Sequence, residues 1–175
     1  MTMEALFNNV ENAIAQYEQA YEQEETLYDM MRDAENDMNR YSSQASSSED
    51  ASDQRAALEQ MRAAALRYQQ CQNQLQQVRA AKSQALRYLQ ATRSELTNVI
   101  TSIEDKLPKM DQSISTFEQM AANPFGSSAA AQLPQLRARR AEYQQNLNDA
   151  YTLVDRIDSA LNGGGNSPQK VLRRR

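Results

Sequence analysis

Apolar residues recur at alternating three- and four-residue intervals along most of the chain. This is the spacing of the a and d positions of a coiled coil, and over residues 3–45 it is held with one charged interruption, at Glu24. The pattern predicts helices that bury a continuous stripe. The first seam consists of Met3, Leu6, Val10, Ala13, Tyr17, Ala20, Glu24, Leu27, Met31, Ala34, Met38, Tyr41 and Ala45.

Two further seams follow the first. Four members of the second seam are polar, namely Gln72, Arg79, Lys82 and Arg93. The second seam is predicted as Leu58, Met61, Ala65, Tyr68, Gln72, Leu75, Arg79, Lys82, Leu86, Leu89, Arg93, Leu96, Ile100, Ile103, Leu107, Met110, Ile114, Phe117 and Ala121. The third is predicted as Leu133, Leu136, Arg140, Tyr143, Leu147, Ala150, Val154, Ile157 and Leu161.

The segments between the seams have loop composition. "SSQASSSEDASDQ" is serine-rich and acidic, with Ser52 as the expected N-cap, and "NPFGSSAAAQLP" contains two prolines and a glycine. We therefore expect helices at about 2–44, 53–121 and 133–162, and loops at about 45–52 and 122–132. These elements form one predicted domain, residues 1–162, and residues 163–175 form a flexible basic tail.

The lengths and charges of these segments predict how the helices pair. The central helix is about as long as the other two together, so a bundle of three equal helices does not fit. Residues 1–53 carry 13 acids and two arginines, whereas residues 54–93 carry seven bases and one acid. Opposite charge favours the first helix lying on the first half of the second. The predicted fold class is all-α, an elongated antiparallel coiled coil of three helices, with the third helix on the second half.

Register within this fold can be predicted by aligning the seams. In the first hairpin Tyr41 would face Leu58 and Met31 would face Tyr68, and in the second hairpin Arg93 would face Ile157. Pro108 falls inside the second seam, which keeps its phase on both sides. We predict a kink within the helix at Pro108, held by the third helix near Tyr143, and no helix boundary there.

The composition disfavours catalysis. The chain has no histidine, its one thiol is Cys71, and no glycine-rich phosphate loop follows a strand. We expect a non-enzymatic protein with no cofactor, no metal site and no small-molecule substrate. The first residues carry no export signal and no window is apolar enough to cross a membrane, so we expect a soluble, cytoplasmic protein, with export without a cleaved signal peptide as the alternative.

Two groups of residues are candidates for binding. A stripe at seven-residue spacing flanks the first seam and could dock a partner helix or widen the internal seam or a self-dimer interface: Phe7, Ile14, Tyr21 and Tyr28. The tail could contact nucleic acid or an anionic membrane electrostatically, or be a charged end without a ligand: Lys170, Arg173, Arg174 and Arg175.

Two segments, "YTLVD" at Tyr151 to Asp155 and "YEQEE" at Tyr21 to Glu25, match a Tyr-x-x-x-Asp/Glu pattern. In this pattern, in its helical hairpins and in its lack of histidine, the chain resembles the WXG100-like and LXG-like proteins of type VII secretion. Phe125-Gly126 lacks the residue that separates the aromatic from the glycine in that group's turn. The resemblance implies an exported substrate or chaperone with Tyr151 and Asp155 as the secretion signal.

The seams and the missing catalytic residue types favour a scaffold, adaptor or partner-dependent subunit that acts by binding proteins or by self-association through helical faces. A type VII secretion-associated protein is the alternative. A factor that associates with nucleic acid or membrane through its basic tail is the second alternative.

Overall fold

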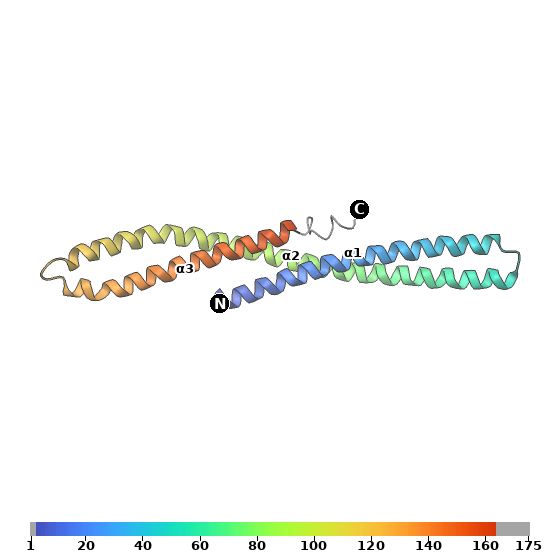
Figure 1. The fold of residues 1–175 in the computed structure, drawn as a ribbon, viewed down its shortest axis with the longest axis horizontal. Helices are drawn as coiled ribbons and strands as arrows, with labels where there is room; N and C mark the ends of the chain where they lie inside the picture. Colours follow the sequence, from blue (N-terminus) through green and yellow to red (C-terminus); the bar gives the residue numbers. More distant parts are fainter. Residues whose placement is uncertain (1–2, 164–175) are drawn as a thin grey trace. The chain divides into compact units, whose positions relative to one another are not determined.

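The computed structural model describes residues 3–163, and within them the chain is all-α, as predicted. The described residues form three helices: α1 (Met3–Ser47), α2 (Ala51–Ala121) and α3 (Ser127–Gly163) (Figure 1). No strand occurs among these residues. None of the described helices is long and apolar enough to cross a membrane.

The connection between α1 and α2 is shorter than expected. α1 continues to Ser47, and α2 begins at Ala51 with Asp50 as its N-cap, because the Asp50 carboxylate accepts a 2.7 Å hydrogen bond from the Ser52 amide. Ser52, the predicted cap, therefore lies two positions too late. Several serines of this segment donate to carbonyls one turn earlier, as Ser43 and Ser47 do, so they are accommodated within the helix.

The connection between α2 and α3 is also short, since α3 begins at Ser127 and not near residue 133. Pro134 lies inside α3, and Ala129, which was expected in the loop, is buried. The turn depends on Gly126, where an added Cβ would lie 2.1 Å from the Met120 carbonyl oxygen. Close approach of the two helix ends therefore excludes any side chain at this position.

Contacts divide the chain into two units, and both α1 and α2 contribute to each. Unit 1 contains residues 3–14 and 87–163 of the described chain, and thus parts of three helices. Unit 2 contains residues 15–86, the remainder of α1 paired with the first half of α2.

Unit 1 has a core to which all three helices contribute. Its largest fully buried side chains are Val10 of α1, Leu89 of α2, and Leu153 and Ile157 of α3. α2 runs through Pro108 without ending, as predicted, and the seam from Leu96 to Ala121 is buried or half-buried at its predicted positions. A bend at Pro108 stays a prediction. In the turn of α2 just before Pro108, the Lys106 ammonium lies 5.7 Å from the centre of the Tyr143 ring of α3.

Unit 2 is a hairpin in which α1 and α2 lie side by side in opposite directions (Figure 1). The α1 seam predicted from the sequence is buried or half-buried throughout this unit. Leu27 of α1 and Cys71 and Leu75 of α2 form a buried cluster, with Met31 and Val78 packed against it.

The predicted seam of α2 is wrong by one residue at every second position between residues 57 and 92. Half of the inward positions are as predicted, namely Met61, Tyr68, Leu75, Lys82, Leu89 and Leu96. The alternate inward positions each lie one residue before the predicted member, and they are Ala57, Ala64, Cys71, Val78, Ala85 and Thr92. The predicted members Leu58, Ala65, Gln72, Arg79 and Arg93 are exposed, and Leu86 is half-buried. Small side chains occupy most of the alternate inward positions, which favours close approach of the two helices there.

The ion pairs between helices can be compared with the predicted register in each unit. In unit 2 Asp37 pairs with Arg67, whereas the predicted register, in which Tyr41 faces Leu58, places Arg32 opposite Arg67. In unit 1 Arg93 pairs with Asp158, next to the predicted partner Ile157. The interdigitated side-chain packing of a coiled coil stays a prediction.

Candidate functional site

With the α2 seam as observed, one apolar stripe of α1 and one of α2 lie on the same side of unit 2. Tyr21 and Tyr28 lie one residue after α1 seam positions, and Leu58 and Leu86 lie one residue after α2 seam positions. Tyr28 contacts Arg79, which occupies the same kind of position in α2, so these positions of the two helices border one side of the hairpin. We call this side the tyrosine flank, defined as Tyr21, Tyr28, Leu58, Ala65, Arg79 and Leu86.

A group of charged and aromatic side chains surrounds Glu24 beside this flank. Glu24 accepts a 2.5 Å hydrogen bond from Lys82 Nζ and a 3.1 Å bond from Arg79 Nε. Arg79 also donates to the Tyr28 hydroxyl, and the Lys82 ammonium lies 4.4 Å from the centre of the Tyr21 ring. The charged interruption of the α1 seam is thus matched by one basic interruption of the α2 seam, Lys82, and by Arg79 beside the seam.

The geometry around Glu24 has an electrostatic consequence. The hydrogen bond from Lys82 lowers the pKa of the Glu24 carboxyl, and the bond from Arg79 acts in the same direction, while partial burial opposes them. Glu24 is therefore held as a carboxylate that neutralises cations near the hairpin seam. This arrangement fixes register between α1 and α2, because a slip of one turn would leave the half-buried Lys82 without its acceptor.

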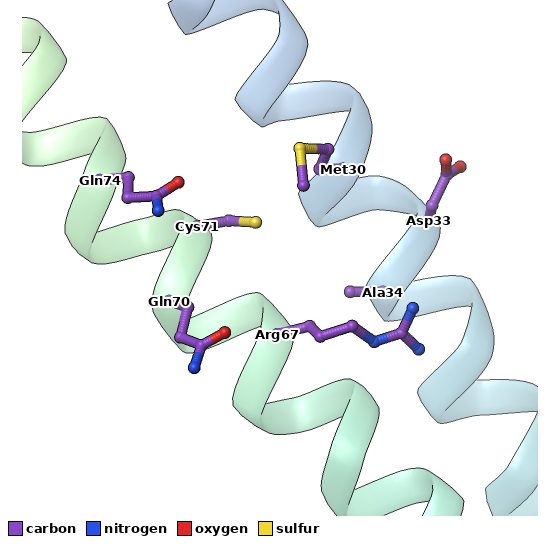
Figure 2. Close-up of a pocket in the computed structure, with 7 residues that line it drawn as sticks. All are labelled: Met30, Asp33, Ala34, Arg67, Gln70, Cys71 and Gln74. Atoms are coloured by element: carbon purple, nitrogen blue, oxygen red, sulfur yellow. The ribbon is translucent and has the colours of Figure 1, made fainter.

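The opposite side of unit 2 carries a shallow groove of about 250 Å³ (Figure 2). Figure 2 shows Cys71 and Met30 directed into the space between the two helices, whereas the carboxylate of Asp33 points away from it. The groove exists because small residues, Ala34 and Cys71, occupy adjoining seam positions. It is lined by Met30, Asp33, Ala34, Arg67, Gln70, Cys71 and Gln74.

In unit 1, α3 is held against both other helices by paired charges. Arg156 donates to both carboxylate oxygens of Glu11 in α1, at 2.9 and 2.8 Å. Arg93 of α2 donates to both oxygens of Asp158, at 2.6 and 3.0 Å. The hydrogen bonds from the two arginines lower the pKa values of the Glu11 and Asp158 carboxyls. α3 therefore offers a basic side chain to α1 and an acidic one to α2.

The predicted partner-binding stripe does not form one exposed face. Ile14 is buried, Phe7 and Tyr21 are half-buried, and only Tyr28, at 45 % exposure, is open to solvent. Partner binding by these residues stays a prediction, and Tyr21 and Tyr28 are its accessible members.

The candidate secretion signal lies on α3 in unit 1. Tyr151 and Asp155 are both exposed, one helical turn apart, and the Tyr151 hydroxyl donates to Glu104. This hydrogen bond raises the pKa of the Tyr151 hydroxyl. The candidate electrostatic tail, Lys170, Arg173, Arg174 and Arg175, lies outside the described residues.

Two surface features were not predicted. One is the groove beside Cys71, which follows from the unexpected phase of the α2 seam. The other is Phe125, which is 96 % exposed in the turn between α2 and α3. A signal for the second was present in the sequence, since residues 119–136 contain no charged side chain.

Residues 3–163 contain no group of three or more histidine, cysteine, aspartate or glutamate side chains placed to hold a metal ion. Comparisons of the chain with protein-family models, with curated proteins and with solved structures gave no match.

Proposed function

We propose that this protein is a non-enzymatic, cytoplasmic scaffold or adaptor that acts by binding other proteins through the helical faces of unit 2. The observation that carries the proposal is that unit 2 has two helices and leaves large apolar side chains in solvent. Tyr28, Met30, Leu58 and Leu66 are between 42 and 57 % exposed. Two packed helices shield only one stripe of each, so a wider apolar stripe needs a further element to cover it.

The size of the uncovered surface fits a binding role. Full burial of one such side chain is worth about 1.5–3 kcal/mol, and each is already about half buried, so Tyr28 and Leu58 on the tyrosine flank supply only a part of a micromolar binding energy, which is about 8 kcal/mol. Tyrosine is also among the residue types that carry most of the energy in protein interfaces. The charged group at Glu24 would hold α1 and α2 in one register, so that a partner meets one fixed arrangement of the exposed side chains.

The proposal is tested by site-specific crosslinking of the full chain. The photoreactive residue p-benzoylphenylalanine is placed at Tyr28 or, as a matched control, at Gln19, an exposed α1 position away from the tyrosine flank. A pull-down from the native source should give a defined partner that crosslinks from position 28 and not from position 19. The same selectivity must be found with the purified partner, and equal crosslinking from both positions would contradict the proposal.

A type VII secretion substrate or chaperone is the second candidate, and the exposure of both Tyr151 and Asp155 on one side of α3 favours it. Secretion would be measured in a host with a type VII ATPase, comparing the wild type with Tyr151→Ala and Asp155→Ala. The control is Tyr88→Ala, which removes another exposed tyrosine of unit 1. Loss of export in the first two variants alone supports this candidate, and absence of wild-type export excludes it.

A further inference from the structure

The way α3 docks in unit 1 supplies a template for helix recognition. Arg156 of α3 binds Glu11 on one edge, Asp158 binds Arg93 on the other, and Leu153 and Ile157 are fully buried. A helix that binds this pair of helices thus needs a basic residue toward α1, an acidic residue toward α2 and an apolar centre.

The residues of α1 that form this template recur at intervals of seven. Glu18 and Glu25 follow Glu11 at this spacing, as Tyr21 and Tyr28 follow Ile14. Seven residues are close to two turns of an α-helix, so each set occupies one stripe of the continuous helix α1. Unit 2 therefore repeats the glutamate edge and the apolar stripe that unit 1 presents to α3.

α2 repeats its part of the template only once, because Arg79 carries the charge of Arg93 and Leu86 does not. Leu86 and Arg79 precede Arg93 by seven and fourteen residues, and Arg79 borders the tyrosine flank through its contact with Tyr28. Glu18 and Glu25 are exposed and take part in no ion pair among the described residues. Unit 2 thus carries the acidic edge of the docking template without the basic residue that neutralises it in unit 1.

We propose that the tyrosine flank binds one amphipathic helix of a partner protein, with basic residues seven positions apart along the edge that faces α1. These residues would pair with Glu18 and Glu25 as Arg156 pairs with Glu11, and the partner's apolar stripe would cover Tyr21, Tyr28 and Leu86. This inference rests on the proposed function and names the chemistry of the partner. It commits to a helix because Glu18 and Glu25 repeat the position of Glu11, to which a residue of helix α3, Arg156, binds in unit 1.

The test uses the full chain and a stapled, fluorescein-labelled peptide with the sequence of residues 145–163 and the change Asp149→Arg. This change places basic residues seven apart, at positions 149 and 156. Fluorescence anisotropy should show saturable binding with one peptide per chain. The double variant Glu18→Lys/Glu25→Lys should bind at least about tenfold more weakly, because two charge pairs worth up to about 1 kcal/mol each are lost and like charges are introduced.

The matched control is Glu22→Lys/Asp29→Lys, which changes the net charge equally at exposed positions outside the flank. It should bind within about threefold of the wild type, because long-range charge effects are screened by salt. Glu18→Gln/Glu25→Gln serves as a milder variant with an intermediate affinity, and circular dichroism confirms the helix content of each protein. Equal binding to the wild type and the flank variant would overturn the proposal, since the peptide would then occupy the α3 site or no specific site.

Two other occupants of the flank have their own outcomes. If sedimentation equilibrium shows a wild-type dimer that Glu18→Lys/Glu25→Lys dissociates, the flank belongs to a second copy and the proposal is wrong. If the peptide binds only after deletion of residues 164–175, the chain's own C-terminal segment is the occupant and the proposal is again wrong. If a partner crosslinks from position 28 but the peptide fails to bind, the proposed function is supported. The inference that the partner is a helix with basic residues seven positions apart is then wrong.

Discussion

Unit 1 and unit 2 share helices α1 and α2, and unit 1 also contains α3, yet the two units bury different kinds of side chain. The largest fully buried residues all belong to unit 1, namely Val10, Leu89, Leu153 and Ile157. The buried positions of α2 in unit 2 are mostly small, such as Ala57, Ala64, Cys71 and Ala85. The third helix makes the difference, because it encloses side chains from several directions, whereas two helices enclose only those directly between them.

The comparison extends to the charged residues. In unit 1 the paired arginines hold α3 at exposed positions, each bound to one carboxylate. In unit 2 one half-buried carboxylate, Glu24, serves two cations at the seam itself. Unit 1 therefore depends mainly on apolar packing, and unit 2 depends more on polar contacts that specify register.

The largest expected effect is that of cavity formation in unit 1. Leu153→Ala should lower the free energy of unfolding of unit 1 by about 3–4 kcal/mol, because a fully buried leucine leaves a cavity that the three helices close only partly. Leu75→Ala in unit 2 should cost about 2 kcal/mol, since two helices can collapse onto the gap. Hydrogen exchange read by mass spectrometry reports each unit separately. Equal losses would contradict the proposed difference in packing.

The second prediction concerns the turn that joins α2 and α3. Gly126→Ala places a methyl group against the Met120 carbonyl and should destabilise unit 1 by about 1–3 kcal/mol through the backbone shift that this contact requires. Gly163→Ala is the control, because nothing lies within 4 Å of a Cβ added there. Urea denaturation followed by circular dichroism measures both. A turn that accepts alanine without loss would show that the helix ends are not held as closely as described.

The third prediction tests the polar group of unit 2. Glu24→Ala should cost about 1–2 kcal/mol, because it removes charge-assisted hydrogen bonds from a half-buried lysine. Glu118→Ala breaks an exposed pair with Arg137 in unit 1 and should cost at most about 0.5 kcal/mol. Chemical denaturation with hydrogen exchange assigns each loss to its unit. If the two losses are equal, Glu24 acts as an ordinary surface charge.

The sequence predicted the all-α class and most of the seam positions because heptad spacing survives in side-chain type. It also predicted that α2 passes through Pro108, since Leu107 and Met110 keep the phase of the seam. The α2 seam in unit 2 was assigned wrongly because size was taken as the sign of burial. Leu58 is larger than Ala57, but close approach of two helices favours the alanine at the interface.

The candidate site was predictable only in part. The first seam and its flanking stripe identified Tyr21 and Tyr28, and the opposite charges of residues 1–53 and 54–93 predicted that the first two helices would pair. The sequence did not indicate which side of the hairpin would stay open, because that depends on where α3 begins and ends and on the phase of α2. Ile14 and Tyr28 look equivalent in sequence, yet the structure buries one and exposes the other.

The fourth prediction is the pH dependence of unit 2. Because Lys82 lowers the pKa of Glu24 below its ordinary value of 4.5, the stabilisation is complete above that value and is lost as the pH falls through the folded-state pKa. The difference in free energy of unfolding between the wild type and Glu24→Gln should therefore shrink from about pH 6 to about pH 3. Lys82→Met should remove most of this difference at all pH values. A difference independent of pH would show that Glu24 is not held as an anion by Lys82.

The smallest expected effect is at the uncovered surface of unit 2. Leu66 is 57 % exposed, so Leu66→Gln should change the free energy of unfolding by no more than about 0.5 kcal/mol. The same change at Leu75, which is buried, serves as the contrast and should be strongly destabilising. Denaturation is repeated over a hundredfold range of protein concentration, because a surface covered by a second copy would make the Leu66 effect grow with concentration. A concentration-independent effect near zero means that in the purified protein this leucine faces water, and that the apolar surface of unit 2 is available to a different protein.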